Sequence, residues 1–221
     1  MTEHRSPEEI PRYTANERTN HWLTAISFVL AALSGLALYH PATNWLAVLF
    51  GGGPWTRILH PFIGTFMFIV FAMLAVRMWG HNRLEPRDRQ WLRQMGDVIA
   101  NREEKLPKVG RYNAGQKLLF FALVACMIGL VLTGIVMWRP WLAPFFPIDA
   151  IRVASLLHAF FATVLILLII LHVYAAFWVK GATDAMVRGR VTRGWAWKHH
   201  RAWLRELQHD GKPHDERKVT H

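Results

Sequence analysis

Four stretches of the chain contain no Asp, Glu, Lys or Arg and consist mainly of apolar residues. The stretches cover residues 19–56, 58–76, 118–138 and 153–179. His40-Pro41 and the glycines before Pro54 interrupt the first stretch, so it holds one span ahead of the interruption. Each stretch supplies the roughly 20 apolar residues with which an α-helix crosses about 30 Å of hydrocarbon. The pattern predicts an all-α membrane protein, a four-transmembrane-helix bundle.

This pattern also divides the chain into segments. We expect spans at about residues 20–41, 56–79, 115–138 and 151–179, which together form a transmembrane domain over residues 19–180 with a loop at 80–114. An N-terminal tail (1–18) and a basic C-terminal tail (181–221) flank this domain. The alternative is a soluble helical bundle, but its surface helices would carry charge on one face, and these stretches carry none.

The basic residues show how the spans are oriented. The 221-residue chain has a net charge of +11, and 23 of its 26 Lys and Arg fall on one side of a four-span topology: three in residues 1–18, ten from Arg77 to Lys117 and ten from Lys180 onward. The positive-inside rule assigns that side to the cytoplasm. We therefore expect a multi-pass protein of the bacterial inner membrane with both termini cytoplasmic. The charge then suits membrane lipid, anionic lipid included, and not nucleic acid.

Cysteine content limits the redox centres that this chain can hold. Cys126 is the sole cysteine, which excludes an internal disulfide, a CxxC zinc site, a four-thiolate iron–sulfur cluster and a CxxCH haem attachment. Any redox metal must therefore be held by other side chains.

Histidines are the remaining candidates, because four of the twelve lie in or at the ends of spans, where ionisable groups are costly. His158 and His172 are fourteen residues apart on the fourth span. At about 100° and 1.5 Å per residue, both rings project from nearly the same face, about 21 Å apart along the axis. By topology, His21 starts the first span on the side of His172, and His60 starts the second on the side of His158.

Two pairs of imidazoles at matching depths result: an inner pair, His21 and His172, and an outer pair, His60 and His158. Two facing imidazoles in a helical bundle suit a non-covalent b-type haem, whose iron then has no open position for substrate. The pattern therefore predicts two haem b groups that carry electrons across the bilayer, with these four histidines as axial ligands. A glycine such as Gly35 or Gly129 either makes room for haem or allows close helix packing, and the sequence leaves both open.

Several segments of the chain resemble one family closely. They are His21-Trp22, Arg57-Ile58-Leu59-His60-Pro61, Tyr112-Asn113-Ala114-Gly115-Gln116-Lys117, Thr133-Gly134, Trp138-Arg139-Pro140, Leu157-His158-Ala159 and Ala176-Phe177-Trp178-Val179-Lys180-Gly181. In this order, from about Arg18 to Glu206, the chain resembles the gamma subunit, or cytochrome b subunit, of membrane-bound formate dehydrogenase.

The resemblance implies a function and partners. His21 and His172 would ligate the inner haem, and His60 and His158 the outer haem. A quinone, the electron acceptor, would bind near His172 with Asn113, Gly115 and Gln116. Electrons would arrive from an iron–sulfur beta subunit and a molybdenum- or tungsten-containing catalytic alpha subunit. The resemblance leaves open whether the complex forms a higher oligomer. The chain itself would hold no catalytic residues and act as an electron-transfer subunit of a formate:quinone oxidoreductase in anaerobic respiration.

Three other interpretations remain at this point. The histidine spacing equally fits the cytochrome b subunit of a nickel–iron hydrogenase or of thiosulfate reductase. A histidine-containing membrane transporter is a non-redox alternative, which predicts broken helices and an intramembrane carboxylate. For Asn113, an N-cap of the third span is an alternative to a quinone contact.

Three further polar residues have simple expected positions. His199 and His200 are expected in a solvated tail, and Lys117 is expected to reach the membrane surface.

Overall fold

The computed structural model describes residues 8–100, 102, 106–179 and 181–209. Within them, four long helices match the predicted spans: α1 (Ala15–Tyr39), α2 (Gly53–Met78), α5 (Ala114–Met137) and α6 (Ile148–Trp178). All four are long and apolar enough to cross a membrane. The described residues divide into a bundle unit, within 19–77 and 121–172, and a terminal unit, within 8–18, 78–120 and 173–209.

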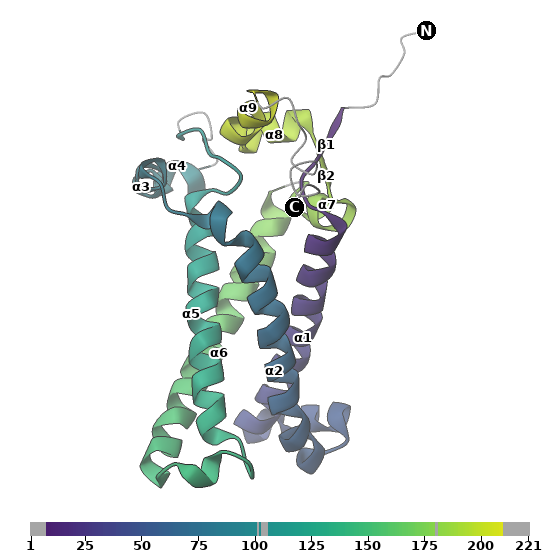
Figure 1. Ribbon diagram of the computed structural model, residues 1–221, viewed down its shortest axis with the longest axis vertical. Helices are drawn as coiled ribbons and strands as arrows, with labels where there is room; N and C mark the ends of the chain where they lie inside the picture. Colours follow the sequence, from purple (N-terminus) through teal and green to yellow (C-terminus); the bar gives the residue numbers. More distant parts are fainter. Residues whose placement is uncertain (1–7, 101, 103–105, 180, 210–221) are drawn as a thin grey trace, which may run out of the picture. The chain divides into compact units, whose positions relative to one another are not determined.

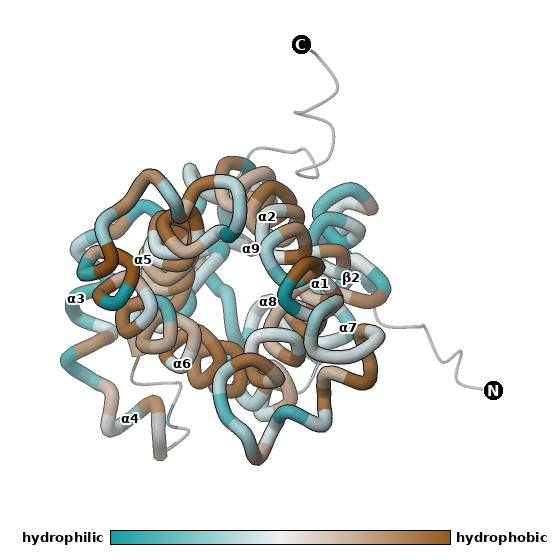
Figure 2. The backbone as a smooth tube through the Cα atoms, turned by 90° about the horizontal axis from the view of Figure 1, so that it is seen from below, coloured by the Kyte–Doolittle hydropathy of each residue, from teal (hydrophilic) through white to brown (hydrophobic). Residues whose placement is uncertain are grey.

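In the bundle unit, the four long helices run alongside one another (Figure 1). Seen from below and coloured by residue hydropathy, these helices consist largely of hydrophobic residues (Figure 2). One residue or more from every helix enters a shared apolar core: Ala31, Met67, Cys126, Met127 and Leu165. Most other large apolar side chains of these helices are exposed, such as Leu167 and Ile170. An apolar exterior around a small core is the arrangement that lipid solvates.

The bundle unit also contains short helices at the chain connections. The 3₁₀ helix η1 (Pro41–Phe50) follows α1 and packs Leu46 and Ala47 against Ala37. His40 caps η1, because its Nδ1 accepts a hydrogen bond from the Ala42 amide at 3.1 Å. The short η4 (Ala143–Phe145) lies between α5 and α6.

In the terminal unit, segments far apart in sequence form one fold. β1 (Glu9–Pro11) pairs antiparallel with β2 (Arg190–Thr192), with Ile10 opposite Val191. Val191, Trp203 and Leu204 lie in the unit's apolar core. The other elements are listed in chain order: η2 (Trp79–Asn82), α3 (Pro86–Arg93), α4 (Met95–Ile99), α7 (Ala182–Arg188), α8 (Arg193–His199) and α9 (Arg201–His209).

Parts of both predicted tails are therefore ordered, since β1 lies in the first and β2 in the second. The long helix α1 begins at Ala15 because Thr14 and Glu17 form a capping box: the Glu17 amide donates to Thr14 Oγ1, and the Thr14 amide donates to Glu17 Oε2. The segment after the fourth span folds against residues 9–11 because its Trp and Leu side chains bury apolar area there.

Candidate functional site

Four histidines form two pairs inside the bundle unit. The rings of His21 (α1) and His172 (α6) have centroids 6.3 Å apart and planes at 53°. The rings of His60 (α2) and His158 (α6) have centroids 6.2 Å apart and planes at 75°. All four side chains are partly buried. The structure thus brings together the same inner and outer pairs that the topology predicted.

The spacing within each pair suits two ligands of one metal. A metal–nitrogen bond is about 2 Å long and an imidazole centre lies about 1 Å beyond its nitrogen, so opposite ligands have centroids about 6 Å apart. Nδ1 of His21 is buried and has no hydrogen-bond partner among the described residues. Buried polar atoms without a partner are uncommon, so this nitrogen indicates a group other than protein.

The donor set further restricts the kind of metal centre. No group of three or more His, Cys, Asp or Glu in the described part of the chain could hold a metal ion. Two imidazoles without further protein donors fit a metal that brings its own equatorial ligands. The two pairs therefore fit the axial positions of b-type haem.

Glycines on α1 and α5 lie directly against the outer pair. A Cβ added at Gly35 would be 3.2 Å from Cε1 of His60, and one added at Gly134 would be 3.5 Å from Cε1 of His158. Gly129 instead faces the ring of Phe161, where a Cβ would lie 2.5 Å from Cδ2. In the protein itself, Gly35 thus makes room for an imidazole and Gly129 for helix packing.

The start of α5 carries the residues predicted to contact quinone. The Gln116 amide donates to Asn113 Oδ1 at 2.9 Å, and the Asn113 amide donates to Gln116 Oε1 at 3.0 Å. This reciprocal cap uses the side-chain oxygens, not the NH₂ groups, so the two amides retain donors. At Gly115, an added Cβ would meet the buried Trp91 ring at 3.2 Å, which gives this glycine a packing role. The quinone contacts stay predictions.

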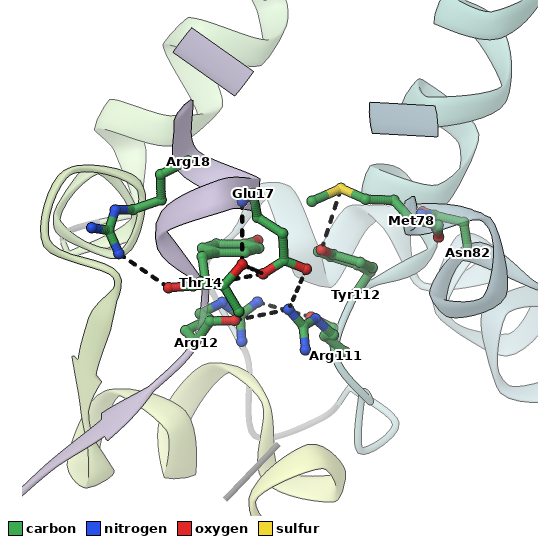
Figure 3. A network of polar contacts seen from close by, with 9 residues as sticks. Arg12, Thr14, Glu17, Arg18, Met78, Asn82, Arg111 and Tyr112 are labelled. Carbon is green, nitrogen blue, oxygen red and sulfur yellow. Dashed lines mark hydrogen bonds and ion pairs between the residues drawn. The ribbon is translucent and has the colours of Figure 1, made fainter. Parts of the chain in front are cut away.

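A buried polar network joins the N-terminal segment to the segment before α5 within the terminal unit (Figure 3). Arg111 Nη2 lies 3.6 Å from Glu17 Oε1, and both side chains are buried. Arg12 and Arg111 each donate to the backbone carbonyl of the other at 2.8 Å. The Tyr112 hydroxyl faces Met78 Sδ, and burial raises its pKa. These contacts order residues 12–17 against residues 111–112.

His200 lies in the same unit and corrects the prediction of a solvated tail there. Its side chain is buried, its Nδ1 is 2.8 Å from the Gly110 carbonyl, and its Nε2 is 3.2 Å from Arg12 Nη2. Arg12 can only donate, so Nε2 accepts and Nδ1 donates, which is the neutral form. Burial, and then the charge of Arg12, lower the pKa of His200 well below its ordinary value. Tertiary contacts with residues 12 and 110 decide this burial.

Lys117 also has buried partners. Its Nζ lies 2.8 Å from Asp88 Oδ2 and also donates to the Arg83 carbonyl. The Lys117 side chain is buried because both partners come from the loop before α5. Lys117 is thus held by a buried ion pair, and its position relative to the membrane surface stays a prediction.

Sequence reasoning missed two hydroxyls beside the outer pair. Ser34 Oγ is 2.9 Å from Nδ1 of His60, and Thr133 Oγ1 is 2.8 Å from Nδ1 of His158. A usable signal was present, because Ser34-Gly35 and Thr133-Gly134 are both hydroxyl–glycine dipeptides inside predicted spans.

The fold and these sites define a class of protein: a four-helix membrane bundle with histidine pairs suited to b-type haem. Comparison with known proteins agrees, since residues 12–189 match the family described as prokaryotic cytochrome b561. The chain belongs to this family. Membership implies a b-type haem cofactor and a multi-pass membrane protein.

Individual relatives within this family are also similar to the chain over most of its length. The formate dehydrogenase cytochrome b556(fdo) subunit of Escherichia coli K12 is 46% identical over 201 residues, which are 91% of this chain and 94% of the relative. The nitrate-inducible formate dehydrogenase cytochrome b556(Fdn) subunit of the same strain is 41% identical over 87% of this chain and 88% of the relative. A formate dehydrogenase cytochrome b556 subunit of Haemophilus influenzae is 40% identical over 89% of this chain and 83% of the relative. These relatives are named as cytochrome subunits, in line with an electron-transfer role.

Proposed function

We propose that this chain is the membrane-anchor, dihaem cytochrome b subunit of a formate dehydrogenase complex. It carries electrons from an iron–sulfur subunit on the outer side of the bacterial inner membrane to quinone at the cytoplasmic side. The iron–sulfur subunit in turn receives electrons from a molybdenum- or tungsten-containing catalytic subunit. Both termini, the loop at 80–114 and the segment after Trp178 are cytoplasmic in this proposal, in accord with the positive-inside rule.

The observation that carries the proposal is the presence of two imidazole pairs with centroids 6.2 and 6.3 Å apart in one bundle. His21 and His172 would hold one haem, and His60 and His158 the other. Haem iron with two axial nitrogens supplies one-electron transfer and leaves no position for substrate. The protein's part is to fix four rings on continuous helices. Both members on α6 lie fourteen residues, about 21 Å, apart, so one helix spaces the two sites.

Quinone would bind at the start of α5. The NH₂ groups of Asn113 and Gln116 supply hydrogen-bond donors suited to a quinone carbonyl, because their oxygens are used in the helix cap. Asn113, Gly115 and Gln116 also lie in the Tyr112–Lys117 segment that resembles the formate dehydrogenase family.

Two alternatives are less well supported. A cytochrome b subunit of a nickel–iron hydrogenase or thiosulfate reductase fits the histidine pairs, but the relatives above, at 40–46% identity, are named for formate dehydrogenase. A transporter predicts broken helices with an intramembrane carboxylate. The four long helices are instead continuous over 24 to 31 residues, and the four charge-free stretches contain no Asp or Glu.

Haem quantitation with a reduced-minus-oxidised optical spectrum on the purified chain or complex tests the proposal. The wild type should hold two b haems, while His158→Ala and His172→Ala should each hold one. The matched control is His40→Ala, because His40 is an exposed histidine at the end of α1 that lies in neither pair. His40→Ala should retain both haems.

Other outcomes would contradict the proposal. A wild-type protein without haem, or substitutions that leave both haems in place, would exclude these ligands. If haem is present but formate fails to reduce it in the purified complex, whereas hydrogen or another donor does, the formate partner would be wrong and the cytochrome would stand.

A further inference from the structure

The outer pair is held by a device that occurs twice in the bundle unit. On α1, Ser34-Gly35 contacts His60; on α5, Thr133-Gly134 contacts His158. In each case the hydroxyl lies within 2.9 Å of Nδ1, and the glycine lies against Cε1 of the same ring. A hydroxyl–glycine dipeptide on one helix thus positions a histidine on the helix that follows it.

The hydrogen bonds of the two hydroxyls determine which ring nitrogen carries the proton. Ser34 Oγ donates to the Ala31 carbonyl at 3.0 Å, and Thr133 Oγ1 donates to the Gly129 carbonyl at 2.7 Å. A hydroxyl has a single proton, so each can only accept from the imidazole. Nδ1 of both rings therefore carries hydrogen, and Nε2 of each neutral ring retains a lone pair. A lone pair is what a metal ligand requires.

In the inner pair, His21 has no such hydroxyl partner at Nδ1 among the described residues. Nδ1 of His21 is buried without a hydrogen-bond partner among the described residues. The two pairs therefore differ in the side chains that hydrogen-bond their rings among the described residues, although their centroid spacings differ by only 0.1 Å.

We propose that Ser34 and Thr133 are positioning residues that fix His60 and His158 for iron through Nε2 and set the reduction potential of that haem. The inference rests on the proposed function. An N–H group that donates to an acceptor makes its imidazole a more basic ligand, and a more basic axial ligand favours ferric iron. The two hydroxyls thus lower the potential of the haem at the outer pair relative to the same ligands without them.

Potentiometric titration of the purified complex, followed by optical spectra, tests this inference. Thr133→Val keeps the side-chain shape and removes the hydroxyl acceptor beside His158, and Ser34→Ala removes the hydroxyl acceptor beside His60. Each should raise the potential of the haem at the outer pair and leave the second haem unchanged. Thr133→Val is then repeated in a His172→Ala background, in which only the outer pair is intact. A shift in potential that persists there belongs to the haem at the outer pair.

Two further variants separate hydrogen bonding from packing. Thr133→Ser keeps the hydroxyl and should return the potential to the wild-type value. Thr163→Val is the matched control, because the Thr163 hydroxyl also donates to its own helix, to Ala159 at 2.8 Å, but lies on the exposed surface of α6. It should leave both potentials unchanged.

Unchanged potentials in both Thr133→Val and Ser34→Ala would overturn the inference, as would the same shift in Thr133→Ser and Thr133→Val. If Thr133→Val loses the haem while Thr133→Ser retains it, the hydroxyl is required for ligation and the positioning role is supported. If both Thr133 variants lose the haem, the inference is tested by Ser34→Ala alone: a raised potential supports it and an unchanged potential overturns it. A wild-type complex without haem would instead refute the proposed function.

Discussion

Lys117 and Asp88 form an ion pair in which Nζ lies 2.8 Å from Oδ2 and each side chain is only 4% exposed. The pair joins the second turn of α5 to the first turn of α3 in the terminal unit. Removing one member of such a buried pair costs about 3–5 kcal/mol, because the other charge stays buried without a partner. We expect Lys117→Met to lower the melting temperature of the purified protein accordingly.

A second substitution tests whether the remaining charge is the cause. Asp88→Asn removes the charge but keeps an oxygen for the Glu85 amide, which donates to Asp88 Oδ2 at 2.7 Å. The double variant should therefore be more stable than Lys117→Met alone. As a control, Arg152→Met breaks an exposed pair with Asp149 and should cost no more than about 1 kcal/mol. A Lys117→Met protein as stable as the wild type would contradict this account.

His200 should make the terminal unit sensitive to acid. Its folded-state pKa lies well below the unfolded value of about 6.5, so below that pH the unfolded chain binds more protons than the folded chain. The stability contribution of the neutral ring is complete above pH 6.5 and is lost as the pH falls from there toward the folded-state pKa. Hydrogen exchange of residues 190–205 should accelerate on going from pH 7.5 to pH 5.5. A His200→Gln variant should show a smaller pH dependence; an equal one would exclude His200 as the cause.

Small substitutions on α1 and α5 should separate the imidazole contact from helix packing. Gly129→Ala places a methyl group within 2.5 Å of the Phe161 ring and should cost about 1–3 kcal/mol of stability through overpacking. Gly35→Ala lies 3.2 Å from His60 Cε1 and should alter the optical spectrum of one haem. Gly64→Ala is the control, because nothing lies within 4 Å of its added Cβ. Identical spectra for Gly35→Ala and Gly64→Ala would show that the ring contact does not matter.

Asn113→Asp separates the cap from the proposed quinone contact. Aspartate retains an oxygen that accepts the Gln116 amide proton, so α5 should keep its cap and its stability. The substitution removes the NH₂ donor, and we expect formate:quinone activity of the complex to fall at least tenfold, while formate still reduces the haems. Asn113→Ala should lose about 1 kcal/mol of stability as well. Wild-type quinone activity in Asn113→Asp would place the quinone contact elsewhere.

The bundle unit could be predicted from sequence because each of its features is local along the chain. A span is a run of apolar residues, and the shared face of His158 and His172 follows from a fixed rotation of about 100° per residue. Topology then placed His21 level with His172 and His60 level with His158. The hydroxyls of Ser34 and Thr133 were missed because their partners lie on other helices, 26 and 25 residues away.

The terminal unit could not be predicted in the same way. The segments Glu9–Pro11 and Arg190–Thr192 are too short for their sequence pattern to indicate a strand pair, and their pairing depends on contacts across about 180 residues. His200 and Lys117 have charged or ionisable side chains that are exposed by default, and distant partners at Arg12, Gly110 and Asp88 bury them.

By itself, the sequence determined the membrane class, the four helices and the histidines that face one another, because apolar length, charge asymmetry and helical periodicity are properties of a continuous segment. The tertiary structure decided which atoms surround those histidines, which ring nitrogen carries the proton, and which ionisable groups are buried. Hydrogen bonds and ion pairs act over about 3 Å, so they exist only once distant segments have been brought together.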